Sequence, residues 1–387
     1  MIEFLAPVSK KVLAHRELLP VGTLGKQLAV HSEKGELPGL KNVKFAILGI
    51  AENRGDIDYL GSNVSFDPYR EALYSLYPGN WNYNIIDLGD IAKGETLEDT
   101  RFAAKEVIAA LMKKNIIPLI LGGSQDLAYA QYRAYDTCGK MVNVVNIDNR
   151  FDLGNAELPI SNKSYVGKMV VDQPYNLFNY SVLGYQSFFN APQEIALMEK
   201  LFFDAFRLGE VTADITAVEP ILRNAEMVTL DVTAIKSAEL SYKNNQSPNG
   251  FDGREICAIS RYAGISNSVK SFSVFELSDS IKTKSGAMLV AQIVWYFIEG
   301  VNFRVKDDDF DNDELFTSYM VPIEDEVLEF KKSNKTERWW IVLPFLSNVN
   351  NKLKRRTLLP CTYGEYLSAC NQEYPERWLK ARHKNEV

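Results

Sequence analysis

The sequence predicts an α/β protein: a three-layer, doubly wound, mainly parallel sheet with helices on both faces. Two observations support this fold class. Apolar runs alternate along the chain with amphipathic segments, as in a parallel sheet joined by helical crossovers. The runs are also nearly continuous rather than alternating between apolar and polar residues, which is typical of strands covered on both faces. A change of pattern after Gly300 predicts a C-terminal β-hairpin and helical extension.

The elements of the main sheet follow one another in a regular order. We expect strands at Val43–Ile50, Tyr83–Leu88, Ile116–Leu121, Val142–Asp148, Ser181–Tyr185, Met227–Val232 and Val269–Phe275. We expect helices at Glu98–Lys113, Gln193–Leu208, Gly253–Ala263 and Ser285–Gly300, with Thr96 as the N-cap of the first. Phe102, Val107, Ile108 and Leu111 would form the apolar face of that first helix.

Three regions are expected: an N-terminal extension (1–42), the α/β domain (43–301) and a C-terminal extension (302–387) packed on the core. In the extension, antiparallel strands are expected at Phe316–Ile323, Val327–Lys331 and Arg338–Phe345, with one or two helices within Tyr363–Arg382.

The acidic run Lys306–Glu314 lacks the glycine and glutamate of a calcium loop, and we expect a solvated loop. Large packing or docking anchors include Phe303, Phe316, Trp339, Trp340, Phe345 and Trp378.

The composition is that of a soluble globular protein. The chain has 387 residues, of which 46% are hydrophobic and 24% charged, and its formal net charge is -7. That mild acidity argues against a nucleic-acid partner. No apolar stretch reaches transmembrane length, so no membrane insertion is expected. With no secretory leader and four unpaired cysteines, a cytoplasmic location with reduced thiols is expected.

Polar side chains follow several of the expected strands. Gln125, Asp148, Asp231 and Glu276 each lie at or just beyond the carboxyl end of a different expected strand. Ligands of open α/β sheets bind beyond the carboxyl ends of the strands, so these four residues predict one pocket. Taken alone, each motif has a simpler reading. An aspartate such as Asp148 often caps a helix, and the glycines before Ser124 suit a strand-to-helix turn or a phosphate nest.

Three of these segments together resemble a known signature. Leu121–Asp126, Asn146–Asp152 and Thr229–Thr233 are similar to the metal-binding motifs of the arginase/agmatinase/formimidoylglutamase family, the ureohydrolases. The resemblance covers roughly Val43 to Val301. It implies the arginase-like fold and a two-manganese site whose bridging hydroxide attacks a guanidinium or formimino carbon. Trimers or hexamers are common in the family, so self-association is also implied.

The metal ligands are only partly retained. Asp148, Asp152 and Asp231 match family carboxylates. Where the family pattern has histidine, histidine and aspartate, this chain has Gln125, Arg150 and Thr233. A further family histidine, near Tyr165, is missing. Glu276 matches a glutamate that contacts the substrate guanidinium, which makes it a candidate ligand-binding residue. The three histidines, His15, His31 and His383, lie outside the sheet domain, and Pro68 and Arg70 match a structural part of the pattern.

Arg150 is the most informative replacement. A guanidinium cannot ligate a cation and stays protonated in proteins. We therefore expect Arg150 to point into the pocket and to contact Asp148, Asp152 or Asp231, partly replacing the metal charge. The excess negative charge would require solvent, a nearby lysine such as Lys236, a raised aspartate pKa or a bound cation.

The sequence thus favours a catalytically inactive ureohydrolase fold, a pseudoenzyme that serves as a binding or scaffolding module for an unidentified protein partner. No cofactor is expected. One alternative is a divergent formimidoylglutamase- or agmatinase-like hydrolase of non-peptide C–N bonds. That enzyme would hold Mn²⁺ or Mg²⁺ on Asp148, Asp152 and Asp231. Another alternative is a sensor in which Glu276 recognises a guanidinium or amine without hydrolysing it.

Overall fold

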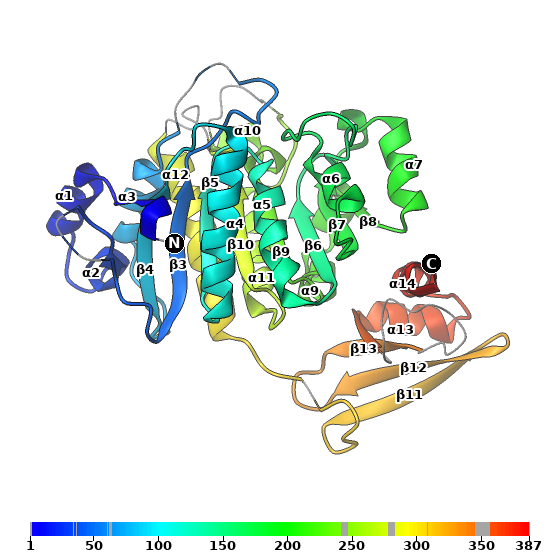
Figure 1. Cartoon of the computed structure of the whole chain (residues 1–387). Helices are drawn as coiled ribbons and strands as arrows, with labels where there is room; N and C mark the ends of the chain where they lie inside the picture. The colour runs from blue at the N-terminus through cyan, green and yellow to red at the C-terminus, as the bar shows by residue number, and fades with distance from the viewer. Residues whose placement is uncertain are drawn as a thin grey trace.

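The computed structural model describes residues 2–33, 35, 37–59, 61, 64–240, 247–277, 283–307, 309–344 and 357–386. Its main sheet has ten strands in the order β1-β4-β3-β5-β10-β9-β6-β7-β8, with β2 also paired to β4. All pairings are parallel except that of β1 with β4. The α/β fold class predicted from the sequence is confirmed (Figure 1).

The strands of the main sheet are β1 (Leu5–Ala6), β2 (Ala29–Val30), β3 (Val43–Ile50), β4 (Asn84–Ile91), β5 (Ile117–Gly122), β6 (Val142–Ile147), β7 (Leu177–Tyr185), β8 (Asp204–Arg207), β9 (Met227–Asp231) and β10 (Ser271–Phe275). The helices are α1 (Lys10–Leu18), α2 (Leu24–Gln27), α3 (Asp67–Ser75), α4 (Leu97–Lys113), α5 (Leu127–Arg133), α6 (Tyr165–Val171), α7 (Pro192–Lys200), α8 (Leu208–Ala213), α9 (Val218–Arg223), α10 (Ser237–Leu240), α11 (Gly253–Ile265) and α12 (Lys284–Asn302).

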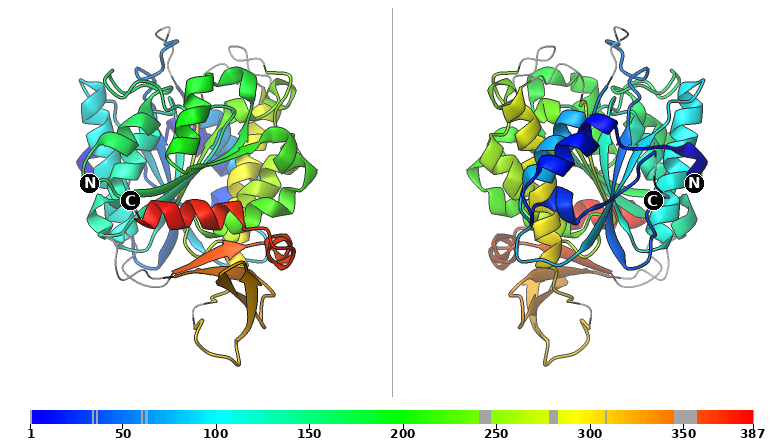
Figure 2. Two further views of the ribbon diagram at one scale, coloured as in Figure 1. Left: turned by 90° about the vertical axis from the view of Figure 1, so that its right-hand side faces the viewer. Right: turned by 90° about the vertical axis from the view of Figure 1, so that its left-hand side faces the viewer.

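Two helical layers cover the two faces of the sheet, as the edge-on views show (Figure 2). Because successive side chains of a strand point to opposite faces, Phe45 and Ile47 pack in one core and Ala46 and Leu48 in the other. The first core includes residues of α3, α9, α11 and α12, and the second includes residues of α4, α5 and α6. Burial on both faces explains the continuous apolar runs in the sequence.

The chain after α12 forms a second, smaller sheet. Its antiparallel strands are β11 (Phe316–Ile323), β12 (Glu326–Ser333), β13 (Trp339–Leu343) and β14 (Thr357–Cys361), in that order, followed by α13 (Tyr363–Cys370) and α14 (Glu376–Glu386). This sheet lies below the amino ends of the main strands (Figure 1). Contacts tie it to the main domain: Arg223 of α9 donates to the carbonyls of Trp339 and Cys361, and Lys384 of α14 contacts Asn179 of β7.

The anchors of this region are mostly packing residues. Phe316, Trp339, Trp340 and Trp378 are all buried, whereas Phe303 is 43% exposed, and Phe345 lies outside the described residues. The Trp378 indole also donates to the carbonyl of Val342. The large aromatic residues of the extension therefore build its own core and its contact with the main domain.

Several elements differ from the sequence expectation. The expected helix Gln193–Leu208 ends at Lys200, and the chain continues as the edge strand β8. Phe102 was expected on the apolar face of α4, but it is 55% exposed and packs edge-on against Phe4. The first forty residues, expected outside the sheet, contribute β1 and β2. No helix in the described part of the chain combines the length and the apolar character needed to span a bilayer.

Candidate functional site

Four neighbouring strands bring the predicted site residues together. Gln125 follows β5, Asp148 follows β6, Asp231 ends β9 and Glu276 follows β10. These strands are adjacent in the order β5-β10-β9-β6, so their carboxyl ends meet at one edge of the sheet. All four side chains are buried. The sequence placed them correctly because the carboxyl ends of parallel strands share one edge.

Gln125 is held by an amide network. Its Nε2 donates to Asn146 Oδ1 at 3.0 Å, and the hydroxyl of Thr229 donates to the same oxygen at 2.7 Å. The Nδ2 of Asn146 in turn donates to Asp148 Oδ2 at 3.0 Å. Gln125 Oε1 is buried without a hydrogen-bond partner among the described residues. Where the family pattern has a histidine, this chain thus presents one unused amide oxygen and no ring nitrogen.

The three aspartates are buried with few donors to satisfy them. Asp148 Oδ1 accepts the backbone N–H of Arg150 at 2.9 Å, and Asp231 Oδ1 accepts that of Thr233 at 2.6 Å. Within the described residues, no N–H or O–H group donates to either carboxylate oxygen of Asp152 or to Asp231 Oδ2. Thr233 Oγ1 is likewise buried without a partner there. Unsatisfied buried carboxylates are costly, so the site must remove part of its negative charge.

The pKa values of two aspartates favour the removal of part of that charge by protonation. Burial, reinforced by the charge of Asp148, raises the pKa of Asp152 well above its usual range. Burial raises the pKa of Asp231 in the same way, with the charges of Asp148 and Glu276 adding to the effect. The raised pKa values of Asp152 and Asp231 favour the protonated forms of these two groups, which lowers the negative charge that the site has to hold.

A lysine that the sequence reasoning overlooked supplies a positive charge. Burial opposes the charged form of Lys163, but the carboxylates of Asp152, Asp231, Glu276 and Asp148 outweigh it and raise its pKa above the usual range. The neighbouring Asn162 donates to Glu276 Oε1 at 3.3 Å.

The segment carrying Lys163 is fixed against the site at a second point, because the backbone N–H of Val166 donates to the carbonyl of Asp152 at 3.2 Å. Lys163 lies two residues before Tyr165, near which the family histidine is missing. That proximity was the signal in the sequence that could have identified Lys163 as a site residue. Lys236, the lysine named from the sequence, instead lines a pocket with Tyr185 and Arg207.

Arg150 does not play the role expected from the sequence. Its Nη1 donates to the backbone carbonyl of Phe189 at 2.8 Å, and its guanidinium lies 4.9 Å from the centre of the Phe189 ring. Its contact with Asp148 is made by the backbone N–H. The prediction that the guanidinium contacts a carboxylate is therefore wrong. A partly buried guanidinium finds both a carbonyl acceptor and an aromatic face at Phe189, which the short spacing of the motif could not reveal.

Glu276 is held in a strained backbone position. Its φ is +61°, in the left-handed region, and its Oε1 accepts the backbone N–H of Gln125 at 2.9 Å. Burial raises its pKa to about 7, against the opposing charge of Lys163. An amine or guanidinium ligand at Glu276 would therefore meet the ammonium group of Lys163 in the same site.

This donor set does not fit a two-metal site. Divalent ions require ionised oxygens and neutral imidazoles, whereas the site offers two aspartates with raised pKa values, an amide, a threonine and a nearby ammonium group. Among the described residues, no group of three or more His, Cys, Asp or Glu side chains is arranged to hold a metal ion. The histidines lie elsewhere: His31 contacts the carbonyl of Leu88, and His383 stacks on Phe202.

Residues 43–299 match the profile of the arginase family. The chain belongs to this family. A formimidoylglutamase of Staphylococcus aureus (strain JH9) is 26% identical over 284 residues, which cover 69% of this chain and 88% of that protein. The family resemblance seen in the motifs is thereby confirmed, and the match ends where the C-terminal extension begins.

Solved structures show the same fold. The formimidoylglutamase of Bacillus subtilis subsp. subtilis str. 168 superposes with a TM-score of 0.63 at 16% identity and covers 70% of this chain and 91% of its own. The formiminoglutamase of Trypanosoma cruzi, solved with Mn²⁺, gives 0.62 at 15% identity, covering 70% and 97%. The agmatine ureohydrolase of Thermoplasma volcanium gives 0.57 at 16% identity, covering 75% and 98%.

Proposed function

We propose that this chain is a non-catalytic member of the arginase family that acts as a binding or scaffolding module. One observation carries the proposal: the carboxylates kept from the family site lie near enough to the ammonium group of Lys163 to raise its pKa, while Gln125, Arg150 and Thr233 stand at the replaced ligand positions. A divalent cation entering this site would meet the positive charge of Lys163 and two aspartates whose raised pKa values favour protonation over metal binding. No histidine lies at the site to move a proton during hydrolysis.

The binding role is assigned to the C-terminal extension. Residues beyond 301 lie outside the region that matches the family, and they fold as a sheet with its own aromatic core. They therefore add surface that a family hydrolase does not need. We propose that a protein partner, or a second copy of this chain, docks there rather than at the strand ends.

A second candidate function is a divergent, metal-dependent hydrolase similar to formimidoylglutamase. The observation in its favour is that Asp148, Asp152 and Asp231 all remain at the site, and that three oxygens of Asp152 and Asp231 have no donor within the described residues. Such oxygens could hold one hard cation if the aspartates were ionised.

The two functions separate in one assay. The full chain is incubated with Mn²⁺ and N-formimino-L-glutamate, agmatine or arginine, and the release of formamide or urea is measured. Our proposal expects no turnover above that of the Asp148→Asn variant. Turnover in the usual enzymatic range of about 1–10³ per second, abolished by Asp148→Asn, would establish the hydrolase instead.

A further inference from the structure

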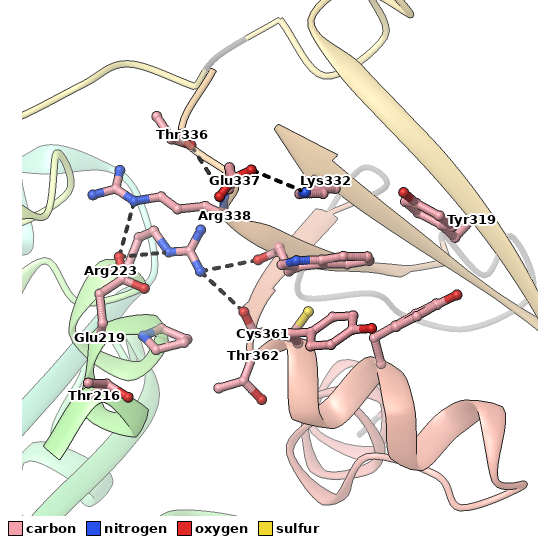
Figure 3. A pocket seen from close by; sticks show the side chains of 14 residues that line it. Thr216, Glu219, Arg223, Tyr319, Lys332, Thr336, Glu337, Arg338, Cys361 and Thr362 are labelled. Carbon is pink, nitrogen blue, oxygen red and sulfur yellow. Dashed lines mark hydrogen bonds and ion pairs between the residues drawn. The ribbon is translucent and has the colours of Figure 1, made fainter. Parts of the chain in front are cut away.

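The smaller sheet has one covered edge and one open edge. Its strands run in the order β11-β12-β13-β14, so β11 and β14 are the edge strands. Helix α9 of the main domain lies against β14, and Figure 3 shows Arg223 donating to the carbonyl of Cys361 there, at 3.3 Å. Among the described residues, no strand pairs with β11 on the side away from β12. An uncovered edge strand offers its N–H and C=O groups to another strand.

The hairpin determines which backbone groups of β11 face outward. A two-residue turn, Glu324 and Asp325, joins β11 to β12, and Ile323 lies opposite Glu326. A turn of this kind closes on a hydrogen-bonded pair, and such pairs alternate with non-bonded ones along an antiparallel ladder. The backbone polar groups that point away from β12 are therefore those of Phe316, Ser318, Met320 and Pro322.

Contacts at the two ends of β11 agree with this pattern and limit the open part of the edge. The backbone N–H of Phe316 donates to a carbonyl of the preceding loop at 3.0 Å, and the side chain of Gln372 donates to the carbonyl of Pro322 at 2.9 Å. Pro322 has no N–H, which suits an outward position. Between these ends, Ser318 and Met320 are exposed, and no partner of their outward backbone groups is found within the described residues.

The strand itself carries no charge. Its eight residues read Phe-Thr-Ser-Tyr-Met-Val-Pro-Ile, and the side chain of Met320 is 62% exposed. Natural sheets commonly protect their edge strands with charged side chains, especially lysine, or with proline. Here Pro322 blocks only the position next to the turn, and the glutamate and lysine side chains lie on the inner strand β12. The middle of the open edge therefore lacks protection against the addition of another strand.

Acidic residues flank the open edge at both ends. Asp313 and Glu314 precede β11, and Glu324 and Asp325 follow it. All four are exposed, and no ion pair of their side chains is seen in the part of the chain that the structure describes. The edge thus presents an uncharged centre between two negatively charged ends.

The neighbouring cations do not balance these acids. At the turn end, Arg382 pairs with Glu326 at 2.6 Å. At the other end, Lys332 pairs with Glu337 at 3.6 Å, which leaves the exposed Lys335, in the turn after β12, against the acidic pair that precedes β11. A partner that adds to this edge would therefore gain from positive charge at both of its ends.

We propose that an extended segment of another protein adds as a strand to the β11 edge, with uncharged residues against Ser318 and Met320 and basic residues beside the acidic ends. The inference rests on the function proposed above and specifies the partner that the extension binds. The charges disfavour a second copy of this chain. In an antiparallel pairing of two copies centred on Tyr319, Glu324 of each copy would lie opposite Glu314 of the other, and like charges in that position are destabilising.

The probe is the fluorescently labelled peptide KKTVTVTKK, titrated with the full chain and followed by fluorescence anisotropy. Saturable binding is expected, with a dissociation constant of about 1–100 μM, as for other small interfaces. The peptide EETVTVTEE, with acidic ends, should bind at least about tenfold more weakly. The peptide KKPPPPPKK should also bind at least about tenfold more weakly, because it keeps the basic ends but its prolines have no N–H to donate.

Paired variants locate the binding. Ser318→Pro removes an outward N–H and should weaken binding about tenfold or more, whereas Ser318→Ala keeps that N–H and should bind as the parent does. Glu324→Asn combined with Asp325→Asn should weaken binding about threefold or more. Its matched control, Glu157→Gln combined with Glu199→Gln, removes two exposed acidic residues of the main domain and should have no effect. Because the turn is exposed, the turn variant tests the site even if the proline variant does not fold.

Three results would overturn the proposal. The first is the absence of binding at millimolar peptide, or equal binding of the basic and acidic peptides. The second is equal binding by Ser318→Pro and Ser318→Ala. The third is a dimer of the chain alone, seen by sedimentation equilibrium and abolished by Ser318→Pro, because a second copy would then occupy the edge. None of these results changes the turnover assay at the strand ends, so the proposal can fail while the non-catalytic function stands.

Discussion

Replacing Lys163 by methionine removes a positive charge from the strand-end site while keeping an unbranched side chain of similar length. The carboxylates of Asp152, Asp231, Glu276 and Asp148 would then lose the nearby positive charge that their own charges favour. A single substitution that removes a favourable charge of this kind typically costs about 0.5–3 kcal/mol. We expect the free energy of unfolding to fall by roughly that amount at pH 8.

The pH dependence follows from the groups around the lysine. Lys163 itself stays protonated between pH 5 and 8, because its pKa is raised above the usual range. Glu276, whose pKa is raised to about 7 by burial, binds a proton over this interval as the pH falls. Protonation of the carboxyl groups removes the repulsion that the missing lysine would expose. The loss caused by Lys163→Met should therefore be largest at pH 8 and smaller at pH 5.

The assay is urea denaturation of the full chain at both pH values, with Lys168→Met as the control. Lys168 is a partly buried lysine of α6, five residues further along, and no carboxylate contact of its side chain is seen in the described residues. Adding Asp152→Asn to Lys163→Met should recover part of the loss, because it removes one of the facing carboxyls. If Lys163→Met and Lys168→Met are equally stable at pH 8, the assignment of Lys163 as the resident cation is wrong.

Two further predictions concern other residues of the candidate site. Arg150→Ala should lower the free energy of unfolding by only about 1–2 kcal/mol, because it removes the hydrogen bond to the Phe189 carbonyl and the contact with the Phe189 ring. This loss should be the same at pH 5 and pH 8. A loss that grows with pH in urea denaturation would show that the Arg150 guanidinium is the counter-charge of the aspartates. The parent should lose stability as the pH rises from 5 to 8, because a carboxyl whose folded pKa is raised to about 7 stabilises the fold at low pH and loses that contribution as it ionises. Glu276→Gln should lose about 2–3 kcal/mol less than the parent over the same interval. Equal pH profiles for parent and variant would contradict the raised pKa of Glu276.

The fold was predictable because its signal is repeated along the chain. The core strands of the family domain are mostly apolar runs, and helix α4 begins at the Thr96 cap expected from the sequence. The errors fall where that signal is weak. Strand β8 has only four residues at the sheet edge, so its pattern merges with the helix before it. Strands β1 and β2 have two residues each and are fixed by pairing with β4 rather than by their own pattern.

The site was predictable in position but not in its charges. Strand ends fixed the place of Asp148, Asp231 and Glu276, because that placement follows from sheet topology. The counter-charge was assigned to Arg150 because it lies within the motif, two residues from Asp148. Local spacing does not determine which way a long side chain turns, and the carbonyl of Phe189, 39 residues away, binds the guanidinium instead. Lys163 reaches the site from a loop that no periodic pattern marks.

The direct measurement of the central claim is the manganese content of the full chain after loading with Mn²⁺ and extensive dialysis. Our account predicts well under one tightly held ion per chain, because Lys163 and the replaced ligands Gln125, Arg150 and Thr233 leave no set of donors suited to divalent ions. Elemental analysis that finds two ions per chain, lost in the Asp148→Asn variant, would contradict the account and restore the family's metal chemistry to this site.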